Sequence, residues 1–217
     1  MVEFTTNEIL CYNSLLDGKK IQGIRLLFPP MTLKRKIIDD TVTYLRKENL
    51  AEESGNLTAV GEAKLHIIRK YKEAEKYLAI NNMAISFQKG RSMIMAVQTK
   101  DDNLMLESGE RTAILQGLLK KYAFLQRNEE CEEEQQTCIL KDDDWENLIE
   151  RIEMKNLILV QKYRNENLIE NLALFCHDGS CYEYRVIEKK LIKKTASGIR
   201  KRLNELLEVE GNRCQRN

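Results

Sequence analysis

The sequence predicts an α+β protein in which helices pack on an antiparallel sheet. Apolar residues make up 42% of the 217 residues and charged residues 32%, a balance typical of a soluble chain that buries a core. With only 10 Gly and 2 Pro, the chain is neither disordered nor a turn-rich all-β protein. The order helix, three strands, helix occurs twice, at about residues 59–126 and 142–208, which predicts a quasi-repeat.

Residues 1–77 are expected to form a helical portion. Thr5 to Glu8 has the pattern of a helix cap, and Thr32 is expected to cap a second helix with apolar residues at helical spacing. A turn-like segment at 49–57 leads into a long helix at about 59–77. The arrangement resembles part of a winged helix.

Residues 78–126 are expected to form the first half of the sheet and its covering helix. The run from Tyr77 to Phe87 alternates like one strand, and a slip in parity at Asn81–Asn82 predicts a bulge. A hairpin signal at Gln88–Arg91 leads to further strands at Ser92–Thr99 and Asn103–Glu107. A helix is expected from Ser108 to about Gln126.

Residues 127–141 are expected to link the two halves. Five glutamates between 129 and 134 repel one another, which favours a loop or a frayed helix end. The second half, 142–208, is predicted to begin with a helix capped by Asp142–Asp144, to continue through three strands, and to end in a basic amphipathic helix at about 191–208. The three strands are expected at 156–163, 169–176 and 181–187. Residues 209–217 are expected to be a polar tail.

Enzymatic activity is not expected from this sequence. It has two histidines: His66 lies in a helical pattern and His177 in a predicted turn, so neither is placed beside a nucleophile and an orienting group. Neither a glycine-rich phosphate loop nor a metal-ligand motif is found, and no cofactor or metal is expected. Cys176 and Cys181 face each other if Asp178–Gly179 is a tight turn, and such a pair could oxidise or bind a soft metal; two reduced thiols are the favoured interpretation.

The sequence favours a cytoplasmic location. The N-terminus lacks the basic and apolar regions of a secretory signal, and no apolar run is long enough to span a bilayer. The six cysteines are scattered, so thiols are expected rather than disulfides. A net charge of +1 gives no general attraction to nucleic acid or to anionic membrane.

A winged-helix DNA-binding regulator is the alternative function. Lys34, Arg35 and Lys36, followed by Arg46 and Lys47, place basic residues on one predicted helix, where they could contact phosphates. Acidic residues share that helix, and no cluster suited to reading bases accompanies them. Nucleic acid is therefore disfavoured as a partner, and protein binding is preferred.

The chain resembles the EspG-type and EsaE-type chaperones of bacterial type VII (ESX) secretion. In the N-terminal part, the resemblance rests on Glu8–Leu10, on Leu50 through Leu57-Thr58-Ala59-Val60-Gly61, and on the long helix that follows. In the middle it rests on the segment from Tyr77 to Met83 and on the hairpin at Gly90.

The resemblance implies a cytosolic, virulence-associated adaptor that binds a helical secretion substrate, such as a toxin, and keeps it soluble for export. The secretion ATPase is a further implied partner, and a homodimer remains open. Eight residues are expected to contact the partner by this resemblance: Ile85, Phe87, Arg91, Met93, Met95, Lys194, Ile199 and Arg202. Methionines adapt well to partner surfaces, but each of them could equally fill the core.

Overall fold

We describe the protein from a computed structural model, in which residues 1–24, 40–99, 103–128 and 136–209 are described. Several predictions lie outside these residues. They are the helix cap at Thr32, the basic residues Lys34–Lys36, the run of glutamates between 129 and 134, and the polar tail beyond residue 209.

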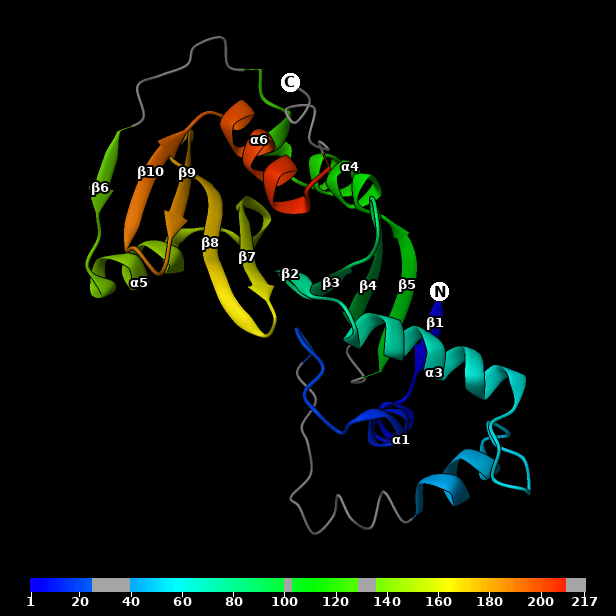
Figure 1. The fold of residues 1–217 in the computed structure, drawn as a ribbon. Helices are drawn as coiled ribbons and strands as arrows, with labels where there is room; N and C mark the ends of the chain where they lie inside the picture. The colour runs from blue at the N-terminus through cyan, green and yellow to red at the C-terminus, as the bar shows by residue number, and fades with distance from the viewer. Residues whose placement is uncertain (25–39, 100–102, 129–135, 210–217) are drawn as a thin grey trace, which may run out of the picture.

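Ten strands form a single antiparallel sheet, in the order β1-β5-β4-β3-β2-β7-β8-β9-β10-β6 (Figure 1). The predicted class, α+β with an antiparallel sheet, is confirmed. The strands are β1 Val2–Phe4, β2 Lys76–Ile80, β3 Met83–Phe87, β4 Ser92–Gln98, β5 Leu104–Glu110, β6 Thr137–Ile139, β7 Leu157–Arg164, β8 Asn167–His177, β9 Ser180–Arg185 and β10 Lys190–Lys194.

The two halves repeat one another around the central pair β2 and β7. The run α3-β2-β3-β4-β5-α4 corresponds to α5-β7-β8-β9-β10-α6, and the short strands β1 and β6 each lie outside the fourth strand of a half. The quasi-repeat is present, with four strands in each half rather than three. The helices are α1 Thr6–Leu16, α3 Ala59–Lys72, α4 Arg111–Lys121, α5 Asp142–Arg151 and α6 Ala196–Leu207, with short 3-10 turns η1 Ala123–Gln126 and η2 Met154–Asn156. Residues 40–47 are also helical.

The additional strand of the first half comes from a turn at Asn81–Asn82. We expected a bulge within one strand, but β2 ends at Ile80 and β3 begins at Met83. Asn81 takes φ 52°, a left-handed conformation that asparagine adopts more readily than most residues. Its side chain fixes the turn by donating to the Tyr122 hydroxyl (2.6 Å) and by accepting from the Leu159 N–H (2.9 Å). The parity slip therefore marks a change of strand.

The additional strand of the second half replaces the first turn of the expected helix at 191–208. Residues Lys190–Lys194 form β10, and α6 begins at Ala196. Thr195 caps α6 by accepting a hydrogen bond from the Gly198 N–H (3.0 Å), a start signal that we missed. The helix expected from Ser108 also begins later, because β5 continues to Glu110. The predicted cap at Thr5 is confirmed, with a capping box to Glu8.

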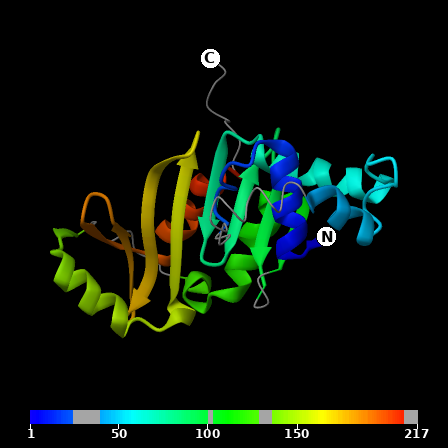
Figure 2. The same ribbon diagram turned by 90° about the horizontal axis from the view of Figure 1, so that it is seen from below.

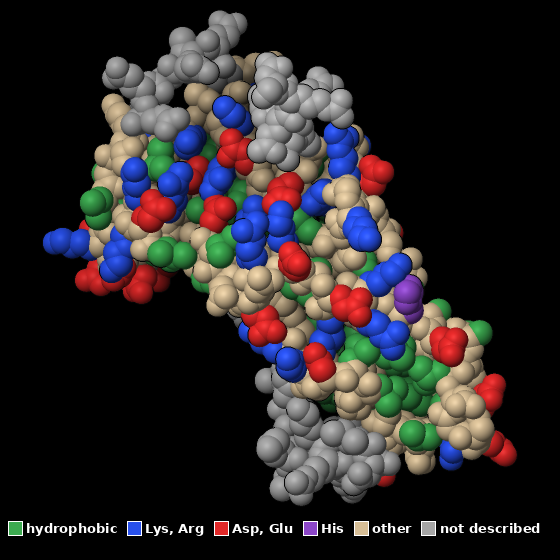
Figure 3. Space-filling model, in the orientation of Figure 1, with side chains coloured by type: hydrophobic (Ala, Val, Ile, Leu, Met, Phe, Trp, Pro, Cys, Tyr) green, Lys and Arg blue, Asp and Glu red, His purple; other side chains and the backbone are tan. Residues whose placement is uncertain are grey.

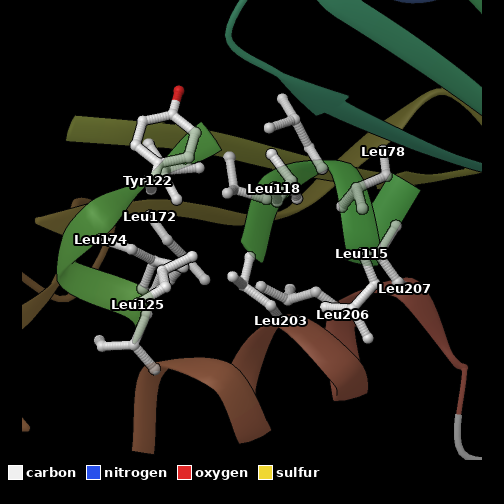
Figure 4. Packing of buried hydrophobic residues seen from close by; sticks show 14 of the residues in the cluster. Leu78, Leu115, Leu118, Tyr122, Leu125, Leu172, Leu174, Leu203, Leu206 and Leu207 are labelled. Atoms are coloured by element: carbon white, nitrogen blue, oxygen red, sulfur yellow. The ribbon is translucent and has the colours of Figure 1, made fainter. Parts of the chain in front are cut away.

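Helices cover the sheet on both faces. We call the face under α4, η1 and α6 the α6 face, and the opposite face the α1 face. Figure 1 shows α4 and α6 on one side of the sheet, with α1, α3 and α5 on the other. On the α6 face, Leu78, Leu172 and Leu174 of the strands pack against leucines of α4 and α6 (Figure 4).

Two separate clusters lie on the α1 face. The larger one packs α1 and α3 on the first half of the sheet and includes Tyr12 and Tyr71. The smaller one packs α5 on the second half, where Trp145 stacks on Tyr184 with ring centroids 4.0 Å apart. Each half of the α1 face therefore has a core of its own, whereas one core spans both halves of the α6 face.

Three cations converge on Glu208 at the end of α6. Its carboxylate accepts hydrogen bonds from Lys76 of β2 (3.0 Å) and Lys162 of β7 (3.3 Å), and it lies 3.7 Å from Arg111 of α4. Glu208 ends the helix with φ 50°, in the left-handed conformation of a C-cap. The cluster therefore ties α6 to the central strands of both halves.

Stability should depend on the ionisation of Glu208. Burial alone would raise the pKa of this carboxyl group, but the Lys76 hydrogen bond and the charges of Lys162 and Lys76 hold the pKa below its ordinary value. A depressed folded pKa stabilises the protein above the unfolded pKa of about 4.3, and this contribution disappears as the pH falls through the folded value. We expect Glu208→Gln to lower stability by about 1 kcal/mol at pH 7. The melting temperatures of variant and wild type should converge near pH 3, and a constant difference would contradict this assignment.

Candidate functional site

The α1 face is unevenly covered near its centre. In the first half, α1 and α3 pack on the sheet, whereas in the second half the described helix on this face is α5 alone. Figure 2 shows α1 and α5 toward opposite ends of the sheet, with β7 and β8 between them. Leu159 of β7 is 39% exposed and Leu168 of β8 is 40% exposed. Apolar surface thus remains accessible, within the described residues, beside the central strands.

A cleft of about 520 Å³ lies on this face, between residues 20–24 and strands β2, β4 and β7. One group of lining residues shares an amide side chain, and a second group is apolar or aromatic. The amides are Gln22, Asn81, Asn82, Gln98 and Gln161. The apolar and aromatic residues are Ile24, Ala79, Ala96, Leu104 and Tyr163. Lys20 is the charged residue among the described lining residues.

The wall of the cleft is the segment 20–24, held by a close approach to β3. Gly23 has φ +78°, and a Cβ at this position would lie 2.6 Å from the Cβ of Ala84. The Tyr71 hydroxyl donates to the Gln22 carbonyl (2.9 Å). Burial raises the pKa of Tyr71 well above its ordinary value, so the hydroxyl stays a donor at neutral pH. The Gly23 backbone and the Tyr71 hydrogen bond therefore fix this wall against the sheet.

The lining of the cleft offers hydrogen-bond donors and acceptors beside apolar side chains. Side-chain amides present both donors and acceptors without titrating near neutral pH. Some of these amides have partners within the chain: Gln161 accepts from the Tyr163 hydroxyl (2.9 Å), and Asn81 fixes the β2–β3 turn. Neither His66, exposed on α3, nor His177, in β8, lines the cleft. Amides beside apolar side chains suit the polar and apolar groups of a polypeptide.

Five of the eight predicted contact residues lie together in the core of the α6 face. The fully buried side chains are Ile85 and Ile199; Phe87 and Met93 are nearly so, and Met95 packs against them. The four buried side chains could meet a partner only if α4 or α6 moved off the sheet, whereas Met95 is partly exposed. The alternative interpretation of the methionines as core residues fits Met93. A partner contact at these positions stays a prediction.

Of the three charged residues in the predicted set, Arg91 lies apart from the other two, and Lys194 and Arg202 lie near the same buried carboxylate. Arg91 is exposed at the β3–β4 turn. Lys194 and Arg202 approach the buried carboxylate of Glu183, at 3.9 and 3.8 Å. Arg202 also pairs with Glu170 of β8. Lys194 and Arg202 therefore already have partners within the chain.

Arg46, one of the basic residues considered for phosphate contact, has a structural role beside the turn-like segment at 49–57. Arg46 donates to the carbonyls of Glu52 (3.0 Å) and Glu53 (2.6 Å), which holds the turn beside the Ala51–Leu57 bridge. Figure 3 shows Lys and Arg side chains interspersed with Asp and Glu over the visible described face. This pattern does not favour the alternative of a DNA-binding surface.

Within the parts of the chain that the structure describes, no group of three or more His, Cys, Asp or Glu side chains is placed to hold a metal ion. Across the same residues, none of the helices has the length and apolar character needed to cross a membrane.

The fold and cleft define a protein with two quasi-equivalent halves around one antiparallel sheet and an amide-lined cleft near their junction. The chain belongs to a family described as a domain of unknown function, DUF5081, which matches residues 3–212. No curated protein matches the sequence.

Among solved structures, the chain is similar to the Mycobacterium tuberculosis type VII secretion system chaperone EspG5, determined in complex with a PE25–PPE41 dimer. The TM-score is 0.54 at 8% sequence identity, and the match covers 95% of this chain and 94% of that chain. At this identity the likeness shows a shared fold over almost the whole length.

Proposed function

We propose that the protein is a chaperone that binds a helical substrate of a type VII secretion system and keeps it soluble until export. The observation that carries the proposal is the fold shared with EspG5 over 95% of this chain, since that protein is a secretion chaperone found with a PE25–PPE41 dimer. The resemblance seen in the sequence points to the same class. A cytoplasmic location, a contact with the secretion ATPase and self-association are further parts of the proposal.

The cleft on the α1 face is the proposed binding site. Burial of the partner's apolar groups against Ala79 and Tyr163 of the cleft would supply affinity, at about 25 cal/mol per Å² of apolar surface removed from water. The amides would select the partner by hydrogen bonds, because a polar group left unpaired in the closed interface lowers affinity. Binding of this kind requires no chemical step by the protein.

Removal of two amides from the cleft should weaken partner binding. We expect the double variant Gln98→Ala/Gln161→Ala to bind its substrate about tenfold more weakly, which corresponds to about 1.4 kcal/mol. Gln116→Ala is the matched control, because Gln116 is exposed on α4 and does not line the cleft. The tagged full-length protein would capture the substrate from a lysate of its own host, and titration with the purified substrate would give the affinities.

One outcome of this experiment would contradict the cleft as the binding site, and a different outcome would contradict the chaperone function. Equal affinity of the double variant and the control would place the binding site elsewhere on a protein that is still a chaperone. Capture of no secretion substrate, together with salt-dependent binding to duplex DNA, would overturn the proposed function itself.

A further inference from the structure

The β8–β9 hairpin brings two cysteines directly opposite each other. Its turn consists of Asp178 (φ 46°) and Gly179 (φ 78°), and the two strands pair His177 with Ser180 and Cys176 with Cys181. A two-residue turn with both central residues at positive φ is a tight hairpin connection whose geometry fixes the register of the strands. The cysteine pair is therefore a fixed feature of this hairpin.

The strand register places the two cysteines at a position where the Cα atoms of opposite residues lie close together. In a hairpin with a two-residue turn, the residues flanking the turn form a hydrogen-bonded pair, so the next pair is a non-hydrogen-bonded one with Cα atoms about 4.5 Å apart. A disulfide accepts Cα separations of about 4.4–6.8 Å. Opposite residues also point to the same face of a sheet, and both cysteines belong to the core cluster of the α6 face.

The surroundings of the pair hold the hairpin in place. Arg127 donates to the Gly179 carbonyl (2.8 Å) at the tip of the hairpin. Arg200 of α6 donates to the Leu125 and Arg127 carbonyls (2.7 and 3.0 Å), which links that contact to the helix. A bond between the two sulfur atoms would thus require side-chain rotation within a backbone that is already positioned.

The other described cysteines lack such a neighbour. Cys11 is buried in α1, and Cys138 is exposed in β6, where it lies opposite Leu191. The structure holds Cys176 and Cys181 as thiols, with Cys176 at 7% exposure and Cys181 at 1%. Within the described residues, an adjacent cross-strand pair occurs at this one place.

We propose that Cys176 and Cys181 form a reversible disulfide across β8 and β9 when the protein meets a peroxide. The more accessible Cys176 loses its proton, and the thiolate attacks one oxygen of hydrogen peroxide. The O–O bond breaks to give a sulfenic acid and hydroxide, and the hydroxide takes up the released proton to form water. The Cys181 sulfur then attacks the Cys176 sulfur, its proton goes to the departing oxygen, and water leaves. Two thiols and one peroxide thereby give one disulfide and two waters, with both sulfurs oxidised and the peroxide reduced.

Mass spectrometry of the full-length protein tests this proposal. The protein would be exposed to an equimolar amount of hydrogen peroxide, quenched, unfolded, alkylated with N-ethylmaleimide and digested. We expect a species in which Cys176 and Cys181 are bridged and not alkylated, two hydrogen atoms lighter than the same residues as two thiols, and we expect dithiothreitol to reverse it. Cys138→Ser should leave this species unchanged, and Cys176→Ser should abolish it.

A second readout keeps the test independent of folding defects. The bridge should slow amide exchange of β8 and β9 near the turn in the oxidised wild type, whereas Cys181→Ala should show the same exchange before and after peroxide. Recovery of both cysteines as alkylated thiols from the oxidised wild type would overturn the proposal. Oxidation of Cys176 to a sulfinic acid without a link to Cys181 would overturn it as well.

Discussion

Replacement of Gly61 by alanine is expected to destabilise the protein by about 3 kcal/mol. Gly61 lies in the first turn of α3, where a Cβ would stand 2.1 Å from the carbonyl oxygen of Leu50 and 3.1 Å from its carbonyl carbon. Both neighbours are backbone atoms, so no side chain can rotate away. The added carbon must push α3 away from the segment that precedes it.

The displacement would also break the hydrogen bonds that begin α3. The Leu50 carbonyl accepts from the Thr58 N–H (3.0 Å), and the Thr58 side chain caps the helix by accepting from the Gly61 N–H (3.2 Å). An overpacked contact costs about 1–3 kcal/mol and a lost cap about 1 kcal/mol, and these sum to the expected effect.

Gly117→Ala is the matched control for Gly61→Ala. Gly117 lies exposed in α4 with no atom within 4 Å of its Cβ position, so alanine should raise stability by about 0.5–1 kcal/mol through helix propensity. Urea unfolding of both variants measures the contrast. If Gly61→Ala were as stable as the wild type, then α3 would be free to shift from Leu50 without loss.

The Gly61 contact illustrates what the sequence could reveal about this part of the chain. The segment from Leu57 to Gly61 was singled out as a motif, and Thr58 does cap the helix that follows. The reason for glycine could not be predicted, because the nearest atom belongs to Leu50, and how closely Leu50 approaches α3 depends on the turn between them.

Local patterns predicted most of the elements. The turn at Asp178–Gly179 and the apolar faces of α3 and α6 are signalled by neighbouring residues, so the hairpins and helices could be predicted from them. The predicted number of strands in each half was wrong, because the turns that precede β3 and β10 contain no glycine to signal them. Asn81 and Lys189 both take positive φ, and lysine gives no sign of this in the sequence.

The cleft could not be predicted, because its residues come from segments that only the tertiary fold brings together. Gln22, Gln98 and Gln161 lie far apart in the chain and share no spacing. Strand alternation shows which residues share a face but does not say which face a helix will cover. Ile85, Phe87 and Met93, which the resemblance implied as partner contacts, lie together on the face that α4 and α6 cover.

Substitution of Glu183 should cause the second large loss of stability, because the Glu183 carboxylate is fully buried. It lies in β9 at 0% exposure, accepts from Arg185 Nε (2.7 Å), and stands 3.9 Å from Lys194 Nζ and 3.8 Å from Arg202 Nε. The three cations come from β9, β10 and α6. Glu183 thus joins β9 and β10 to the last helix.

We expect Glu183→Gln to destabilise the protein by about 2 kcal/mol. Removal of one partner from a buried ion pair costs about 3–5 kcal/mol, because the remaining charge is left uncompensated. The cost should be smaller here, since all three cations retain some contact with water. Glu188→Gln is the control: Glu188 pairs with the same Arg185 (3.3 Å) but is exposed, so its loss should change stability by less than about 0.5 kcal/mol.

A double-mutant cycle would decide the role of Arg202, which the family resemblance implied as a partner contact. If Arg202 serves the network, then Arg202→Ala and Glu183→Gln should be coupled in urea unfolding, and their combined effect should fall short of the sum. Strict additivity in unfolding, with weaker substrate binding by Arg202→Ala alone, would instead assign Arg202 to the partner. Arg202 also pairs with Glu170 of β8. The single variant Glu170→Gln would therefore show how much of the Arg202 effect comes from Glu170 rather than from Glu183.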